Sequence, residues 1–369
     1  MNITNYVRIF GKYTFKEKPF NEIDGLVFSQ LSYVHLEDII KIDKKIPSLA
    51  INKLDDEKIK KISKNTVDGI INIPFLKALK ASNRFKNVLM NYPLFCLDKE
   101  NENQFFAITF ILPNSEIVIA YRGTDITLIG WKEDVNMALM DVIPSQNQAL
   151  NYFKKIREIY RFNKFYLLGH SKGGNLAYFV ALKMDEIHQE YLLGVYSYDG
   201  PGFRKADIFM ENSFYDNHKE LFHKFVPQSS LVGMLLNHTR HAAVIYSTGI
   251  LILNHDPFYW QVNIQEGRFK YVKRRHTSYI NERALENWIN NLSQEDKIIT
   301  ANAIFDFLGG LDKTIYDLGK NIPKALYMFL KNYKEYDEEK KIIIKENVKK
   351  LLSYYRKTLK YFKENGYED

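Results

Sequence analysis

The sequence has very little cysteine and no long uncharged apolar segment. Cys96 is the single cysteine among 369 residues, which excludes an intrachain disulfide and a cysteine-rich zinc site and favours a reducing compartment. No stretch approaches the roughly 18 apolar residues that a transmembrane helix needs, so no such helix is predicted. Residues 1–6 contain no basic segment followed by an apolar run. We therefore expect no signal peptide and predict a cytoplasmic location.

The net charge of +8 comes from Lys and Arg residues that are spread along the chain. No recognised nucleic-acid-binding motif accompanies this charge, so nucleic acid is not an expected partner. The simplest interpretation is a set of solvated lysines, and the alternative is a weak peripheral attraction to anionic membranes. The composition is 46% apolar and 26% charged, which is ordinary for a globular protein and leaves the oligomeric state open.

Apolar runs alternate with helical patterns along most of the chain. This alternation predicts an α/β fold with a doubly wound, mostly parallel sheet, preceded by N-terminal helical elements. We expect one α/β domain over residues 1–295 and a C-terminal helical extension over 296–369. The predicted strands cover residues 104–112, 116–121, 165–168, 191–198, 223–226 and 242–253, with a hairpin over 258–272. The predicted helices cover residues 24–40, 74–84, 131–140, 145–160, 175–184 and 281–292.

The tail after residue 332 is rich in Lys and Glu and carries one regular apolar pattern. The apolar residues step by three and four, which predicts a single stripe along a helix; they are Ile344, Val348, Leu351, Tyr355, Leu359 and Phe362. We expect this stripe to pack on the body or on a neighbouring helix. A membrane or partner surface is the alternative.

Residues 169–173 form a Gly-x-Ser-x-Gly pattern between a predicted strand and a predicted helix. Strand, tight turn and helix is the setting of a nucleophile elbow, in which Ser171 stands at the tip of the turn. The helix N-terminus behind it would stabilise negative charge. The alternative is a glycine-rich turn whose serine only caps the helix.

A catalytic serine needs a base, and in this class of fold the base follows the serine in the chain. His255 comes just after the last predicted strand, in a turn, where a catalytic histidine is expected. His276 is the reserve, in a basic stretch that is expected to be exposed.

The acid is the hardest member to place, because the strand at 223–226 carries no carboxylate. Asp199 ends the preceding strand and is our prediction, although it could also be a simple turn former in Asp-Gly-Pro-Gly. Asp256 neighbours His255 directly, and adjacent side chains usually point apart. Asp216 is a weaker candidate.

An oxyanion hole would complete such a site. One donor is expected to be the backbone N–H of Lys172, and the second to be Thr124, in the turn after the strand at 116–121. Arg122 and Asp134 are predicted to pair and hold that turn, and the alternative for Arg122 is an ordinary surface cation.

Taken together, these motifs resemble a known family. Tyr-Arg-Gly-Thr at 121–124, Trp131 with Asp134, and Gly-His-Ser-Lys-Gly-Gly-Asn at 169–175 resemble the class 3 (fungal-type) lipases of the α/β-hydrolase fold. A little-characterised bacterial branch of that group is more similar still, over about residues 5–290. The segments that carry this similarity are Pro-Phe-Asn-Glu at 19–22, Leu-Ser-Tyr at 31–33, Tyr-Asp-Gly-Pro-Gly-Phe at 198–203, Val-Pro-Gln-Ser-Ser-Leu-Val-Gly at 226–233 and His-Asp-Pro-Phe-Tyr-Trp at 255–260.

The resemblance implies metal-free and cofactor-free hydrolysis of acylglycerols or other carboxylic esters, with a small hydrophobic ester or lipid as substrate. It implies Ser171 as nucleophile, Thr124 as oxyanion residue, Arg122 with Asp134 as supporting pair and His255 as base. The chain departs from class 3 lipases at the acid, because the aligned position is Lys224. Pancreatic-type lipases take the acid from the earlier strand, which supports Asp199. The alternatives are a thioesterase or acyltransferase on the same site, and a non-catalytic hydrolase-like binding module.

Overall fold

The computed structural model describes residues 1–40, 48–66, 68–124, 133, 136–137, 139–204, 212–236, 242–309 and 330–366. One eight-stranded sheet forms the centre, and its strands lie side by side in the order in which they occur in the chain. Antiparallel pairs join β1 through β4, and parallel pairs join β4 through β8. The strands are β1 (Leu49–Ala50), β2 (Leu89–Asp98), β3 (Asn103–Ile111), β4 (Ile117–Tyr121), β5 (Phe165–His170), β6 (Leu192–Tyr198), β7 (Phe222–Pro227) and β8 (Ala242–Ile245).

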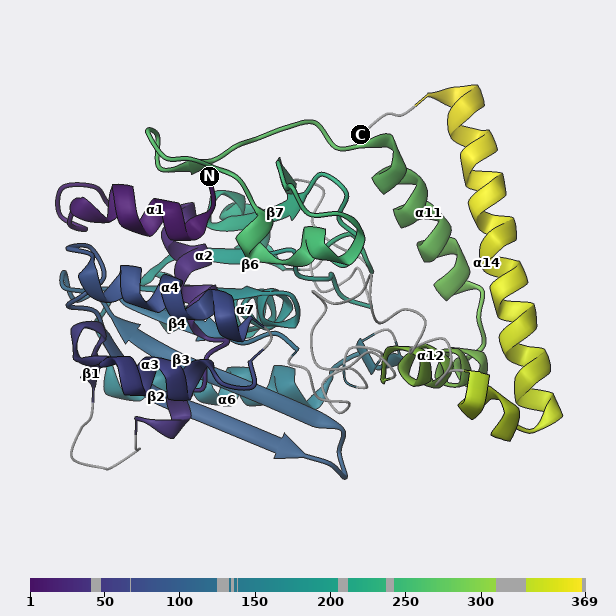
Figure 1. Ribbon diagram of the computed structural model, residues 1–369, viewed down its shortest axis with the longest axis horizontal. Coiled ribbons are helices and arrows are strands. Elements are labelled where there is room, and N and C mark those ends of the chain that lie inside the picture. Colours follow the sequence, from purple (N-terminus) through teal and green to yellow (C-terminus); the bar gives the residue numbers. More distant parts are fainter. Residues whose placement is uncertain are drawn as a thin grey trace.

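Helices cover both faces of the sheet (Figure 1). One layer comprises the N-terminal helices α1 (Ile3–Ile9), α2 (Glu22–Leu31), α3 (Asp56–Ser63) and α4 (Gly69–Ala81). The other layer contains α6 (Pro144–Ile159) and α7 (Lys172–Lys183), with the short α8 (Glu186–Gln189) and α10 (Ser213–Asn217) nearby in the chain. This arrangement confirms the predicted α/β-hydrolase class of fold with N-terminal helical elements.

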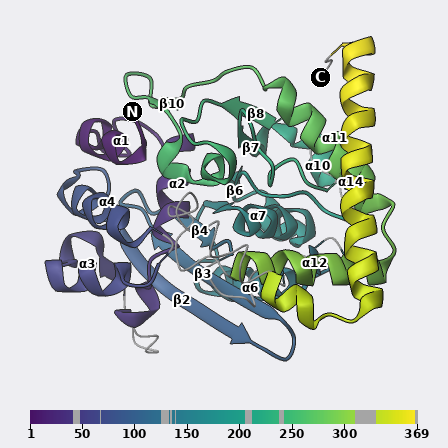
Figure 2. The same cartoon turned by 45° about the vertical axis from the view of Figure 1, so that its right-hand side comes forward.

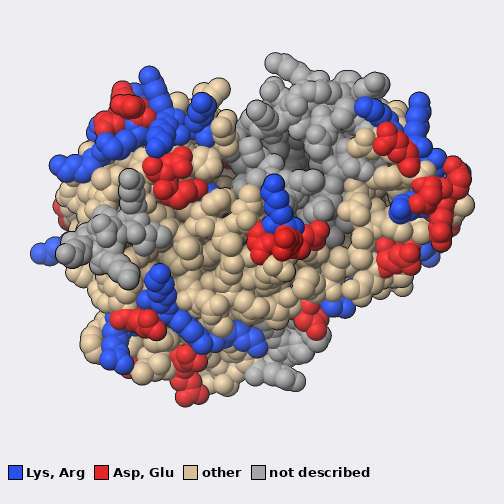
Figure 3. All heavy atoms as spheres, turned by 90° about the horizontal axis from the view of Figure 1, so that it is seen from below, with Lys and Arg blue, Asp and Glu red and all other residues tan. Residues whose placement is uncertain are grey.

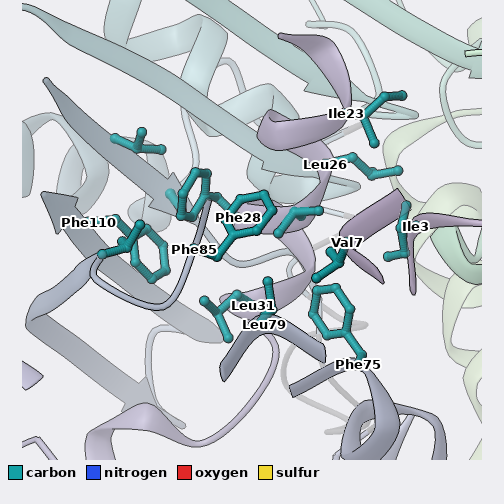
Figure 4. Packing of buried hydrophobic residues seen from close by; sticks show 14 of the residues in the cluster. Ile3, Val7, Ile23, Leu26, Phe28, Leu31, Phe75, Leu79, Phe85 and Phe110 are labelled. Carbon is teal, nitrogen blue, oxygen red and sulfur yellow. The ribbon is translucent and has the colours of Figure 1, made fainter. Parts of the chain in front are cut away.

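The N-terminal layer packs tightly on the sheet (Figure 4). Ile3 and Val7 of α1, Leu26 and Phe28 of α2, and Phe75 of α4 are buried within one cluster. α2 is buried all round from Ile23 to Leu31. In α4 the buried positions, such as Phe75 and Leu79, fall three and four residues apart, so this helix buries one face. The second cluster lies between the other side of the sheet and α6 and α7. The core is thus divided into two layers by the sheet.

Two strand predictions need correction. β2 (Leu89–Asp98) was not predicted, because Asn91 and Pro93 interrupt its apolar residues. The predicted strand over 242–253 is wrong beyond Ile245. There the chain leaves the sheet, pairs with the segment around Tyr271, and forms a 3₁₀ turn over Leu251–His255. The predicted hairpin over 258–272 is present as β9 (Val262–Asn263) and β10 (Arg268–Phe269). The predicted helix over 131–140 falls largely outside the described residues.

The C-terminal helices are α11 (His276–Asn290), α12 (Gln294–Gly309) and α14 (Glu338–Asn365). Figure 2 shows α14 standing at one side of the molecule, alongside α11. Trp288 Nε1 on α11 donates to the carbonyl oxygen of Asn347 at 2.9 Å, and Asn347 Nδ2 donates to Thr300 Oγ1 on α12 at 2.9 Å. The division predicted at residue 295 lies in the first turn of α12 and stays a prediction.

The predicted apolar stripe of α14 is split between two environments. Ile344 and Phe362 are buried against the neighbouring helices, as expected for packing on the body. Val348, Tyr355 and Leu359 are exposed instead. Ile344 and Phe362 are five full turns apart and share one contact line, whereas Val348, Tyr355 and Leu359 lie about 20–60° round the helix from that line, toward solvent.

Charged side chains of both signs are interspersed over the face seen in Figure 3. That distribution is what solvated Lys and Arg residues on a mixed surface produce. In the described part of the chain, no helix is both long enough and apolar enough to cross a membrane.

A buried ion pair ties the N-terminal layer together. The Arg84 guanidinium bonds both oxygens of Asp24 on α2, and neither side chain is exposed. Arg84 also donates to the carbonyl oxygens of Thr14, Lys18 and Pro19 at 2.8–3.1 Å. Every N–H group of this guanidinium therefore has a protein acceptor in place of water, which is the condition for burying a charge in a core.

We predict that Arg84→Met lowers the free energy of unfolding by about 3–5 kcal/mol, because Asp24 would be left buried without its cation. Chemical unfolding followed by circular dichroism measures the loss. Lys77→Met is the matched control, since Lys77 forms only an exposed pair with Asp56, and it should cost less than about 1 kcal/mol. Equal losses in the two variants would contradict the assignment.

Candidate active site

The elbow predicted at 169–173 is present. Ser171 connects the end of β5 to the first residue of α7 and has φ 57° and ψ −133°. A positive φ is strained for a serine and is typical of a nucleophile elbow. Ser171 makes no side-chain cap hydrogen bond to the helix. The alternative in which this serine only caps α7 is therefore wrong.

Close backbone packing holds the elbow in place. A Cβ atom on Gly173 would lie 2.1 Å from the carbonyl oxygen of Tyr121, at the end of β4. A Cβ atom on Gly123 would lie 2.5 Å from the carbonyl oxygen of His170 and 2.9 Å from Ser171 Cβ. No side chain fits at either glycine. The exit of β4 and the serine turn are thus in direct contact.

His255 and Asp199 form a hydrogen-bonded pair beside this turn. His255 Nδ1 lies 2.6 Å from Asp199 Oδ2. The carboxylate is 1% exposed and the imidazole 20% exposed. A carboxylate on Nδ1 fixes the tautomer that leaves Nε2 as the basic nitrogen. The structure therefore brings together the two residues that the sequence predicted as base and acid.

Two residues outside the sequence prediction hold the other carboxylate oxygen. Asp199 Oδ1 accepts from Ser230 Oγ at 2.5 Å and from the Gly233 backbone N–H at 3.1 Å. Asp199 itself has φ 48°, and its N–H donates to the carbonyl oxygen of Phe225 at 2.8 Å. These bonds exceed what a simple turn former requires. Ser230 and Gly233 both belong to the segment 226–233, whose similarity to the bacterial branch is the one sequence feature that could have indicated their role.

His170 lies between the serine turn and the histidine loop. Its ring centroid is 4.4 Å from that of His255, and His170 Nε2 donates to the carbonyl oxygen of His255 at 2.7 Å. Its Nδ1 then accepts from the Tyr33 hydroxyl at 3.0 Å. Burial holds the pKa of His170 well below its usual value, which keeps the ring neutral. His170 and Tyr33 thus fix the loop that carries His255.

The Lys172 side chain is committed elsewhere, so only its backbone faces the site. Lys172 Nζ is bound to Glu133 Oε2 at 2.6 Å and to Gln104 Oε1 at 3.0 Å, and both partners are buried. The Lys172 N–H, at the first position of α7, has no hydrogen-bond acceptor among the described residues. Thr124 follows Gly123 and is half-buried. Their use as oxyanion donors stays a prediction.

Arg122 is buried rather than a surface cation. Its Nε donates to the carbonyl oxygen of Ser32 at 2.5 Å, and its NH2 group lies 3.2 Å from Glu37 Oε2 and donates to the carbonyl oxygen of Val34. The predicted partner Asp134 lies outside the described residues. Arg122 therefore ties the exit of β4 to the segment after α2, a contact over 85 residues that the sequence did not suggest.

The reserve candidates have other positions. His276 is exposed at the first residue of α11. Asp256 Oδ1 accepts from the Phe258 N–H at 2.9 Å and caps the next turn. In the described part of the chain, no group of three or more His, Cys, Asp or Glu side chains is arranged to hold a metal ion.

Lys224, at the position where the resemblance to class 3 lipases implied an acid, is buried on β7 and 4% exposed. It lies opposite Ser197 in the parallel pair of β6 and β7. Ser197 is two residues before Asp199 in the chain. Burial lowers the pKa of Lys224 to about 7, although the charges of Asp199 and Glu282 act in the opposite direction. The β7 strand thus supplies a weakly basic amine in place of an acid.

A family model matches more than half of this chain, and a solved lipase structure is similar to it. Residues 79–306 match the model of a family described as Mbeg1-like. Among solved structures, the chain is similar to one entitled "Crystal structure of M37 lipase", with 16% identity and a TM-score of 0.38. That similarity covers 69% of this chain and 83% of the other. No curated protein matches the chain significantly.

We predict that Lys224→Met changes how stability depends on pH. Between pH 7 and about 10 the unfolded chain keeps a proton on this lysine that the folded chain has lost, so the wild-type free energy of unfolding rises with pH in that window. The wild type should therefore gain about 3 kcal/mol relative to the variant from pH 7 to about pH 9.5.

Urea unfolding of both proteins at the two pH values measures this difference. Every other titrating group is common to both, so it cancels in the comparison. Parallel curves for the two proteins would contradict a deprotonating Lys224.

Proposed function

Since this chain belongs to the Mbeg1-like family and carries Ser171, His255 and Asp199 at one edge of an α/β-hydrolase sheet, we propose that it hydrolyses carboxylic esters through a covalent acyl-enzyme. The class of fold supports a hydrolase of lipase type in general terms. The proposed substrate is a lipid or another hydrophobic acyl ester, and no cofactor is required.

The observation that carries the proposal is the 2.6 Å contact between His255 Nδ1 and Asp199 Oδ2 beside a serine in a strained turn. A structural histidine needs no buried carboxylate, and a structural serine needs no positive φ. The combination is the one that nucleophilic catalysis uses. His170 adds to it, because its bond to the His255 carbonyl oxygen fixes the loop next to Ser171.

In the proposed reaction, Ser171 Oγ attacks the ester carbonyl carbon while His255 Nε2 takes the hydroxyl proton. Asp199 stabilises the imidazolium that forms, and its oxygens are held by Ser230, Gly233 and His255 itself. The bond to the alkoxide then breaks, and His255 returns its proton to the leaving alcohol. Water, deprotonated by His255, then attacks the acyl carbon. The bond to Ser171 Oγ breaks, His255 returns the proton to Oγ, and the carboxylic acid leaves.

The negative charge on the tetrahedral intermediate requires donors already in place. We assign this role to the backbone N–H of Lys172, at the N-terminus of α7, together with Thr124. The ammonium of Lys172 is 1% exposed and bound to Glu133, so it does not reach the substrate. The donors are therefore dipoles on a rigid turn, which need no reorganisation during the reaction.

We predict that Ser171→Ala abolishes labelling by a fluorophosphonate probe and lowers p-nitrophenyl ester hydrolysis by about 10³-fold or more. Ser115→Ala is the matched control, since Ser115 also has a positive φ but lies in the turn between β3 and β4. The control should keep both activities. Full labelling of the Ser171→Ala variant would refute the nucleophile.

The same wild-type protein separates the alternatives. Turnover of matched ester and thioester substrates, with and without an acceptor alcohol, distinguishes hydrolysis of esters from thioester hydrolysis or acyl transfer. A wild-type chain that the probe does not label would instead be a binding module.

We also predict that Asp199→Asn lowers kcat/KM by about 10³–10⁴-fold near pH 7 while the fold is kept. Asparagine retains an oxygen for Ser230 and Gly233 but removes the charge that orients His255. Asp256→Asn is the matched control, because asparagine also caps a turn, and it should stay within about threefold of wild type. If both variants lost kcat/KM to a comparable extent, the assignment of Asp199 as the acid would be contradicted.

A further inference from the structure

The C-terminal helix α14 exposes an apolar row, in which the Tyr355 hydroxyl is the one side-chain group that makes a hydrogen bond among the described residues, to Asn281 of α11. Val348, Leu352, Tyr355 and Leu359 are spaced four, three and four residues apart, which places them on one line along the helix. They are 48%, 53%, 38% and 36% exposed. We call these four residues the apolar row. It runs beside the face through which α14 packs on α11 and α12.

A row of cations flanks the apolar row on the side away from α11 and α12. Its members are exposed and lie within about 100° of the apolar row on a helical projection; they are Lys345, Lys349, Arg356, Lys360 and Lys363. Glu338, in the first turn of α14, projects to the same flank and pairs with Lys341 at 2.9 Å. Glu346 and Glu364 pair with Lys349 at 3.3 Å and Lys360 at 3.8 Å from farther round the helix.

The balance of charge along α14 is the second observation. The helix carries nine Lys and Arg residues and four Glu residues, a net charge of +5. An apolar row bordered by cations suits the boundary of an anionic bilayer, because long basic side chains reach the phosphates while their neighbours enter the acyl region. Four side chains exposed by a third to a half offer far less than the roughly 1,000 Å² that a stable protein interface buries.

We propose that this side of α14 is a docking surface for anionic phospholipid membranes. The packing of α14 supports it, because buried Ile344 and Phe362 hold the helix on the body while the apolar row stays outside. Membrane contact then requires no unfolding of the helix. The proposed contact is peripheral: apolar burial and electrostatic attraction act together at the membrane surface. The structure describes no membrane-spanning helix. It does not depend on the proposed hydrolysis.

The test is sedimentation of the full chain with vesicles. Carrying Ser171→Ala throughout keeps the lipid intact and separates binding from any catalysis. We expect binding to phosphatidylcholine vesicles that contain about 30% phosphatidylglycerol, weak binding to phosphatidylcholine alone, and loss of binding as salt increases.

Two matched double variants locate the surface on the helix. Lys345→Ser with Arg356→Ser removes two cations beside the apolar row and should weaken partitioning about twentyfold, at about fivefold per cation. Lys350→Ser with Lys357→Ser removes the same charge from the opposite side and should change it by less than about threefold. Leu352→Ser should also weaken binding, and circular dichroism checks that each variant is folded.

Equal losses in the two double variants would overturn the proposal, because net charge alone would then explain binding. Wild-type protein that stays in the supernatant with both kinds of vesicle would overturn it as well. So would a dimer without lipid that Leu352→Ser dissociates, since the apolar row would then pair with a second copy of the chain.

Discussion

The backbone of Ser171 is the constraint on which the site depends. A non-glycine residue with a positive φ costs about 1–3 kcal/mol and persists only where its surroundings leave no alternative. Here the Ser171 N–H donates to Tyr198 and its carbonyl oxygen accepts from Gly174, both at 2.9 Å. Gly173 and Gly123 bring the exit of β4 against the same turn. Contacts with β6, with α7 and with the exit of β4 therefore hold the strained turn in place. The turn places the Ser171 hydroxyl at the N-terminus of α7.

The register of the parallel strands extends this constraint to the acid. His170 on β5 lies opposite Tyr198 on β6, so Ser171 and Asp199 follow as the first residues beyond the same edge of the sheet. Both have a positive φ, 57° and 48°. Asp199 is held by β7 through Phe225 and by the next loop through Ser230. The carboxylate thus reaches His255 from a fixed position, although the histidine itself sits on a 3₁₀ turn outside the sheet.

The sequence was sufficient where the physical signal is local. The elbow at 169–173 combines a buried strand, small residues and a helix within 20 residues, so its position and its serine could be predicted. The bonds that hold the site could not, because their partners are distant: Tyr33 meets His170 across 137 residues and Glu37 meets Arg122 across 85. The strand predicted over 242–253 failed for a related reason. An apolar run alone cannot show that the chain leaves the sheet after Ile245 to pair near Tyr271.

Lys224 illustrates how one strand position changes the balance of charge at the site. A carboxylate on β7 would lie close to Asp199, and two neighbouring acids repel each other and raise each other's pKa. A buried lysine avoids that repulsion. Because burial favours its neutral form, it also does not compete strongly with His255 for the charge on Asp199. With Asp199 on β6 as the proposed acid, an amine at position 224 therefore fits better than a second carboxylate. Asp199 Oδ2 contacts His255, while Ser230 and Gly233 share Oδ1.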